Sequence, residues 1–188
     1  MTLKTPPSIL LRSGEYFDFL DPDPSKIHIH DVAYALARLC RFTGHTSEFY
    51  SVAQHSVLAS RLVPPEHAMA ALLHDAAEAF VGDVAAPLKR LLPDYAVIEK
   101  QVEAAISERF GVPFPLPECV KRADLVMLAT EARDLLPRPV SDGGHCAEGA
   151  VNGWAVLRGV EPLRDWIVPW GPTTARVAFL ERYEELRR

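Results

Sequence analysis

The sequence has few cysteines, no long apolar run and no leader-like segment. Its three cysteines, Cys40, Cys119 and Cys146, are far apart and form no CxxC pair. An odd, scattered set of this kind is typical of reduced thiols, so we expect a cytoplasmic protein. There is no 18-residue apolar stretch and no charged leader followed by an apolar run. Neither a membrane span nor a signal peptide is therefore expected.

The chain also lacks an excess of positive charge. Twenty Lys and Arg residues stand against 25 Asp and Glu residues, which gives a formal net charge of −5. Binding to a nucleic-acid polymer is therefore not expected, and an anionic ligand has to be met by a local cluster of side chains or by a metal ion. Hydrophobic residues make up 48% and charged residues 24%, which excludes a disordered, collagen-like or coiled-coil chain.

No segment alternates clearly between polar and apolar residues, and the apolar periodicity is helical. With 188 residues, the chain is long enough for one domain with a core of its own. We predict an all-α, single-domain helical bundle, in which residues 138–188 supply a loop over 138–150 and a last helix of the same domain. After an irregular start of about 30 residues, helices are predicted from Asp31, after the cap residue Ser51, from Pro64 to Gly82, from Asp94 to Phe110, over 118–136 and over 175–188.

Three polar side chains interrupt the most apolar of these helices. His74 and Asp75 are adjacent within the run AMAALLHDAAEAF, and Glu78 follows Asp75 by three residues. At that spacing the three side chains share one edge of a helix. Because an aspartate is seldom placed in such a run unless it is paired or bound to a metal, this edge is a candidate site.

Two further polar residues lie on the expected core stripes of other helices, His55 after Ser51 and Asp124 between Val120 and Met127. Each has an ordinary explanation: His55 as a buried histidine satisfied by a neighbour, Asp124 as an ion-pair partner. Taken together with His74 and Asp75, they would supply two imidazoles and two carboxylates to a common interior. Such a set suits a divalent ion such as Mn, Fe, Co, Ni or Zn, with Mg also possible, and the sequence does not identify which.

The order His55, His74-Asp75 and Asp124 resembles the HD-domain superfamily of metal-dependent phosphohydrolases, over residues 30–135. The segment HDAAE with Asp83 five residues beyond its glutamate, and the block CRFTGHTSEFYSVAQHS, are similar to the bacterial 5′-deoxynucleotidase branch. Two features depart from that branch. Phe42 stands where the branch usually has Trp after the arginine, and the interval from Arg41 to His55 is one residue shorter.

The resemblance implies a role for each residue. His55, His74, Asp75 and Asp124 are expected to bind the metal, and Glu78 to handle the proton of the attacking water or of the leaving group. Asp83 is expected to contact the sugar 3′-hydroxyl or orient the substrate, Arg41 to bind phosphate, and Phe42 to stack on sugar or base. No histidine lies between Asp75 and Asp124, so one firmly held ion is expected, with further ions arriving only with a triphosphate.

The leading functional hypothesis is a 5′-nucleotidase that releases phosphate from deoxynucleoside monophosphates. The alternatives are a triphosphohydrolase acting on a nucleoside triphosphate and, from a different class, a non-catalytic helical binding module that keeps a degenerate site. The resemblance and the aromatic C-terminal segment favour a homo-oligomer, with Trp154, Trp166 and Trp170 as core or interface anchors. Lys89 and Arg90 are interpreted as a solvated turn, and His45 as a loop histidine at the surface.

Overall fold

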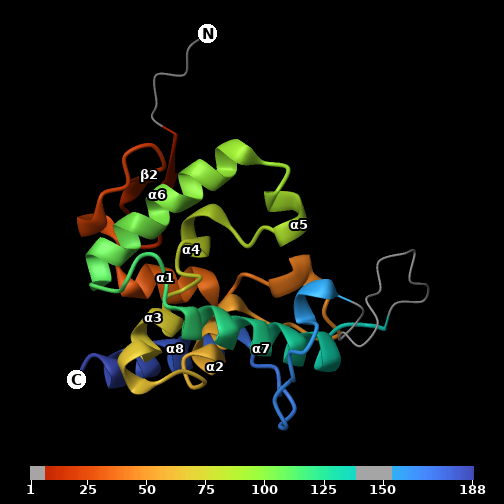
Figure 1. Cartoon of the computed structure of the whole chain (residues 1–188). Coiled ribbons are helices and arrows are strands. Elements are labelled where there is room, and N and C mark those ends of the chain that lie inside the picture. Colours follow the sequence, from red (N-terminus) through yellow and green to blue (C-terminus); the bar gives the residue numbers. More distant parts are fainter. Residues whose placement is uncertain (1–6, 139–153) are drawn as a thin grey trace.

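The computed structural model describes residues 7–138 and 154–188, and this part of the chain is mostly helical, as predicted (Figure 1). Nearly all of the loop predicted over 138–150, with Cys146, lies outside the described residues. The α-helices are α1 Ile29–Leu36, α2 Val52–Ala59, α3 Ala68–Leu72, α4 Glu78–Val81, α5 Ala86–Lys89, α6 Pro93–Phe110, α7 Glu118–Asp134 and α8 Pro172–Leu186. Short 3₁₀ turns occupy η1 Pro24–Lys26, η2 Arg41–Gly44, η3 Pro65–His67 and η5 Ala155–Leu157.

A small hairpin occupies the first segment, where the sequence predicts irregular or extended chain. Strands β1 Ser8–Leu10 and β2 Tyr16–Asp18 pair antiparallel, with Ile9 opposite Phe17. The buried Phe17 ring lies 4.3 Å from the ring of Phe80 in α4, measured between centroids. The hairpin is therefore packed onto the helices by an aromatic contact.

Several helix boundaries follow the sequence signals. The Ser51 hydroxyl accepts a hydrogen bond from the N–H of Gln54 at the start of α2. Gly111, with φ of 65°, ends α6 in the left-handed conformation that favours glycine. The first helix begins at Ile29, two residues before the predicted start at Asp31: His28 occupies the cap position, and the Asp31 carboxylate accepts from the N–H of Ser13. That carboxylate ties α1 to the hairpin.

The single helix predicted from Pro64 to Gly82 is broken into η3, α3, a turn and α4. Within the turn, the N–H groups of Ala76 and Glu78 donate to carbonyls three residues back, a 3₁₀ pattern tighter than that of an α-helix. The His74 imidazole also takes the carbonyl of Ala71 as its acceptor, at 2.8 Å. Alanine-rich sequence alone favours a continuous helix here, and the local propensity gives way to the contacts of the His74 side chain.

Three helices, α1, α2 and α3, pack against the last helix, α8. Helix α2 also contacts α7, and α1 contacts α4. In Figure 1, α7 crosses beside α2, and α6 lies at the opposite end of the molecule, with α5 next to it. The core between them buries side chains such as Leu36, Leu72, Val102 and Phe179. No helix in the described ranges has the length and apolarity needed to cross a membrane.

Candidate metal centre

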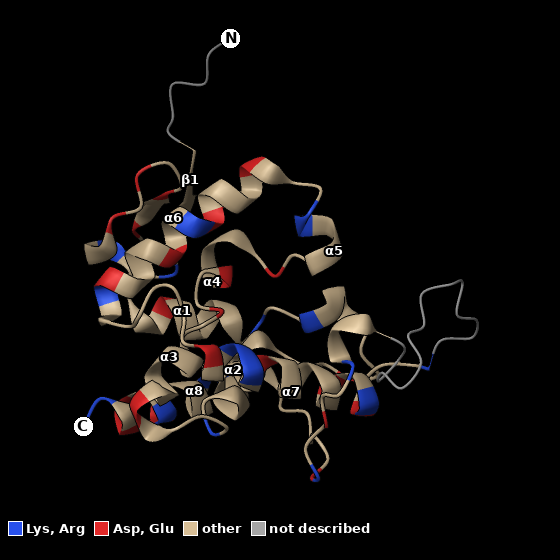
Figure 2. Ribbon diagram, viewed as in Figure 1, with Lys and Arg blue, Asp and Glu red and all other residues tan. Residues whose placement is uncertain are grey.

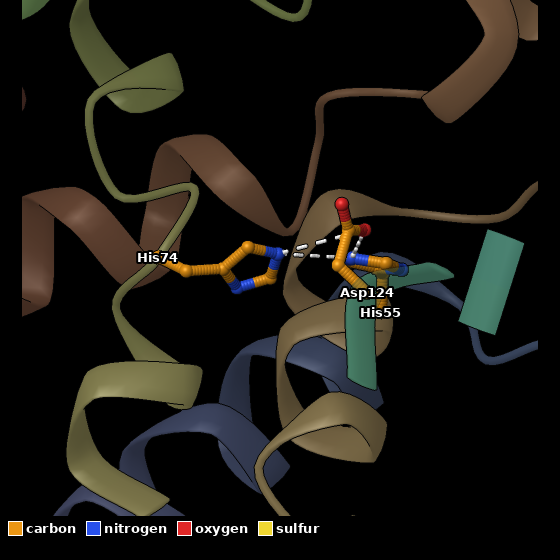
Figure 3. A group of neighbouring side chains, drawn as sticks. All are labelled: His55, His74 and Asp124. Atoms are coloured by element: carbon orange, nitrogen blue, oxygen red, sulfur yellow. Dashed lines mark hydrogen bonds and ion pairs between the residues drawn. The ribbon is translucent and has the colours of Figure 1, made fainter. Parts of the chain in front are cut away.

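Three elements bring the predicted metal ligands together. His55 comes from α2, His74 from the turn after α3, and Asp124 from α7, and their side chains point toward one another (Figure 3). The two Nε2 atoms lie 3.2 Å apart, and Asp124 Oδ1 is 3.2 Å from the Nε2 of His55 and 3.9 Å from that of His74. These three ligand atoms lie within 4.8 Å of one another, so the group could hold a metal ion.

Asp75, the fourth predicted ligand, lies beside the two imidazoles but outside this group of three. Its Oδ2 atom is 3.2 Å from the Nε2 of His74 and 3.5 Å from that of His55. It also faces Arg41, whose Nη1 atom lies 3.4 Å away. The structure therefore gathers two imidazoles and two carboxylates, with Asp124 the most exposed of the four side chains at 41%. The exposed side of Asp124 leaves the cluster open to solvent.

Each imidazole is held so that the same nitrogen faces the cluster. His55 Nδ1 lies 2.6 Å from a carboxylate oxygen of Glu131, and His74 Nδ1 lies 2.8 Å from the backbone carbonyl of Ala71. Both partners are acceptors, so each Nδ1 atom carries the hydrogen and donates it. Each neutral ring then offers the lone pair of Nε2, which is the orientation that metal-binding histidines take.

The carboxylates of the cluster favour positive charge on the two imidazoles or between them. Burial and Arg41 lower the pKa of His55, but Glu131 and Asp124 outweigh them and raise it to about 10. Burial likewise lowers the pKa of His74, and Asp75 and Asp124 raise it above its ordinary value. Burial raises the pKa of Asp124, whereas the two neighbouring imidazoles, His55 and His74, lower it overall. Either protons or a cation must therefore separate the facing lone pairs and carboxylates, and this nitrogen and oxygen set fits a divalent ion.

A buried carboxylate that the sequence analysis missed supports the cluster. Glu131 is fully buried, and besides His55 it accepts from Arg41, with 3.0 Å to Nη2 and 3.2 Å to Nε. Burial raises the pKa of Glu131, but Arg41 and His55 lower it below its ordinary value. Glu131 follows Asp124 by seven residues on α7, which is two helical turns and thus the same face. That spacing is the signal that would have found it.

Glu78 and Asp83 lie next to the cluster. Glu78 begins α4, is 8% exposed, and its Oε2 atom is buried without a hydrogen-bond partner in the described part of the chain. Burial, followed by the charges of Asp75 and Asp83, raises the pKa of Glu78 to about 9. Burial also raises the pKa of Asp83, although Arg41 opposes it. Figure 2 shows acidic positions on α4 and on α7, the elements that carry Glu78 and Glu131.

Lys89 corrects the interpretation of its segment as a solvated turn. Its Nζ atom lies 2.6 Å from Glu99 and 4.0 Å from Glu78, and its side chain is 28% exposed. Tyr95 holds the same region by donating its hydroxyl hydrogen to the carbonyl of Gly82, at 3.1 Å. Arg90, its neighbour, is exposed as expected. The start of α6 thus anchors a cation beside Glu78.

The segment of Arg41 and Phe42 has an unusual backbone. Phe42 and Thr43 both have φ of 54°, a conformation that L-residues other than glycine rarely adopt and that costs about 1–2 kcal/mol per residue. The Phe42 ring lies 5.4 Å from the Arg41 guanidinium carbon and 6.3 Å from the ring of Trp154. The structure thus places the Phe42 ring next to Arg41 and Trp154.

The remaining aromatic and histidine predictions have mixed outcomes. Trp154 and Trp170 are partly buried against hydrophobic clusters, whereas Trp166 is 69% exposed beside Arg133. His45 is exposed, as the loop interpretation predicts.

Two bacterial proteins are similar to this chain over most of its length. The uncharacterized Escherichia coli protein YfdR is 45% identical over 175 residues, which cover 93% of this chain and 92% of YfdR. The chain belongs to the YfdR family. An uncharacterized protein of Rhodobacter capsulatus is 38% identical over 137 residues, 65% of this chain and 70% of that protein. No family model matches the chain.

Replacing Glu131 with Gln is expected to destabilise the fold strongly. The change removes the fully buried carboxylate that contacts both Arg41 and His55 and leaves Asp75 and Asp124 as their remaining acidic neighbours. Breaking a buried ion pair by removing one partner costs about 3–5 kcal/mol. The free energy of unfolding, measured by urea denaturation, should fall by that amount. Glu118→Gln, an exposed glutamate on the same helix, is the matched control and should unfold as the wild type does. An E131Q protein of wild-type stability would contradict this account of the network.

Metal binding is expected to release protons and to weaken as the pH falls. Burial lowers the pKa of His55, but Glu131 and Asp124 raise it to about 10, so this ring carries an extra proton at neutral pH that an incoming ion has to displace. Titration calorimetry with Co²⁺ or Zn²⁺, in two buffers of different ionisation enthalpy, measures the release.

The matched variants are His74→Ala, which should lose the ion, and His45→Ala, which removes an exposed imidazole and should keep it. Binding that is unchanged in H74A, or that releases no protons, would contradict the site.

Proposed function

We propose that this protein is a metal-dependent phosphohydrolase of the HD-domain type, acting as a 5′-nucleotidase on (deoxy)nucleoside monophosphates. The observation that carries the proposal is the cluster itself. Two imidazoles, each oriented by an acceptor on Nδ1, present Nε2 toward Asp75 and Asp124, and Glu78 is buried beside them. Perturbed acids next to a solvent-open ligand cluster are typical of catalytic sites.

Different residues of the site would bind the metal ion, the phosphate and the nucleoside. A divalent ion held by His55, His74, Asp75 and Asp124 would supply Lewis-acid stabilisation of phosphoryl charge and a nucleophile at neutral pH. Arg41, already oriented by Glu131, presents its guanidinium to the edge of the cluster, where a phosphate oxygen can accept from it. Asp83 supplies an acceptor for a sugar hydroxyl, and Phe42 a ring for the sugar or base.

Glu78 fits the role of proton donor to the leaving group. With a pKa raised to about 9, its carboxyl group holds a proton at neutral pH. Water adds to phosphorus, the bond from phosphorus to the 5′ oxygen breaks, and its electron pair goes to that oxygen, which takes the proton of Glu78. The carboxylate recovers a proton from the water that attacked. The net products are nucleoside and inorganic phosphate.

One observation favours a triphosphohydrolase as the second candidate. Lys89 places an ammonium group 4.0 Å from Glu78, so the site has a cation besides Arg41 that a longer phosphate chain could contact. Its hydrogen bond to Glu99 holds this ammonium on the α6 side of the site. A nucleoside triphosphate would then be cut to nucleoside and triphosphate by the same residues.

Release of inorganic phosphate from dAMP, compared with release of triphosphate from dATP, tests the two candidates. We expect dAMP to be cleaved in the presence of Mn²⁺, Co²⁺ or Mg²⁺, and Asp124→Asn to abolish the cleavage because it removes a ligand. Cleavage of dATP alone would replace the leading candidate by the second. A protein that binds the ion and cleaves neither nucleotide would overturn the proposal and favour a binding module.

Glu78→Gln should keep the metal and lose turnover. The amide has nearly the same shape but cannot donate an acidic proton, so we expect the turnover number to fall by about 10²-fold or more. In the wild type, kcat/KM should decline as the pH rises through the pKa of Glu78, because the acid form is consumed. Metal content and the pH profile are measured together, with the exposed Glu108→Gln as control. Normal turnover in E78Q would show that the proton comes from elsewhere.

A further inference from the structure

A cavity lined by none of the proposed metal ligands lies between the hairpin and helices α1 and α4. Its volume is about 460 Å³, within the range of small-molecule sites. Most of its wall is apolar, and its polar groups come from the turn of the hairpin and from one face of α1. The polar and aromatic lining residues are Arg12, Asp31, Tyr34 and Arg38.

Two exposed arginines, Arg12 and Arg38, line this cavity and share the ring of Tyr34 as a neighbour. The guanidinium carbon of Arg12 lies 4.2 Å from the centroid of the Tyr34 ring, and that of Arg38 lies 3.5 Å from it. Among the described residues, neither arginine makes an ion pair. The ring attracts both cations but has no charge of its own, so both positive charges stay unpaired. An anion in contact with both guanidinium groups would supply the missing counter-charge.

The two arginines are held in place from different elements. The turn that carries Arg12 is closed by hydrogen bonds from Gly14 to Leu11 and from Leu11 to Glu15, and the N–H of Ser13 donates to Asp31 of α1. Arg38 donates from Nη1 to the carbonyl of Tyr34, at 3.1 Å. These contacts fix the backbone at Arg12 and the guanidinium of Arg38, which lowers the ordering cost of binding an anion.

Asp31 does not serve as the missing counter-ion. Its Oδ1 atom accepts from the N–H of Ser13, its Oδ2 atom is buried without a hydrogen-bond partner in the described part of the chain, and neither arginine lies within ion-pair distance of the carboxylate. Both arginines thus line the cavity with their charges unpaired, and the apolar part of the lining includes Ile9, Leu10, Ala79 and Phe80. A ligand that fits must combine a compact anion with a flat apolar body.

We propose that this cavity binds a small aryl or heteroaryl phosphate. The phosphate would accept hydrogen bonds from Arg12 and Arg38, for which the planar guanidinium is well suited. The ring would lie against the apolar wall. Ala79 and Phe80 of that wall belong to α4, the helix that begins with Glu78, so an occupant would contact the helix that carries the proposed proton donor.

Phenylphosphonate is the probe, because its carbon–phosphorus bond resists hydrolysis by the proposed activity. Calorimetric titration of the full-length protein should show a binding component that Arg12→Gln and Arg38→Gln each weaken about tenfold or more, as expected for loss of a charged hydrogen bond. Arg158→Gln, which removes an exposed arginine elsewhere, is the matched control and should bind as the wild type does. Thermal unfolding of each variant checks that it is folded.

Two comparisons make the result decisive. Phenylphosphonate binding at this cavity should persist in Asp124→Asn, because it does not depend on the proposed metal centre. If the only binding component is lost in D124N and kept in R12Q, phenylphosphonate binds at the metal centre and the proposed second site does not exist. Methylphosphonate carries the same anion without the ring and should bind about tenfold more weakly. Equal affinity for the two phosphonates, or wild-type affinity in R12Q and R38Q, would overturn the proposal, whether or not the protein hydrolyses nucleotides.

Discussion

The arrangement of the site depends on one buried carboxylate, that of Glu131. It has no contact with solvent, so its charge has to be compensated from within the protein, and His55 on α2 and Arg41 on η2 provide this compensation. Because the three residues come from three different elements, satisfying the charge also sets the positions of those elements. The direction in which His55 presents its Nε2 atom is a consequence of this buried charge.

The same network concentrates more negative than positive charge at the cluster. Asp75, Asp124, Glu78 and Asp83 lie around or beside the two imidazoles, while Arg41 is shared between Glu131 and Asp75. Burial, reinforced by these like charges, keeps one of the acids protonated: the most buried of the four, Glu78, has the strongly raised pKa. A cation at the ligand cluster and a proton on Glu78 would both reduce the same excess of negative charge.

The sequence identified the site residues that interrupt an apolar helix stripe, and it missed those whose role depends on how the helices pack together. His55 and Asp124 stand out because a polar residue on an apolar stripe needs an explanation. Glu131 lies on the same face of α7 as Asp124, so its position was accessible from the spacing, but its burial was not, since the depth of a helix face depends on what covers it. Lys89 was missed for a different reason: its partner Glu99 comes from the next helix, and no local pattern reports such a contact.

The helix predicted over residues 64–82 breaks at the residues that carry His74, Asp75 and Glu78, where helix propensity alone predicts the wrong backbone. In an α-helix, Glu78 would align with His74, four residues earlier. In the tighter 3₁₀ turn, with three residues per turn, it aligns more closely with Asp75. That alignment is consistent with the charge of Asp75 acting on the Glu78 pKa more strongly than any other residue. The alanine-rich segment is therefore not a regular α-helix in this turn. The resulting register brings Glu78, the acid with the raised pKa, close to Asp75.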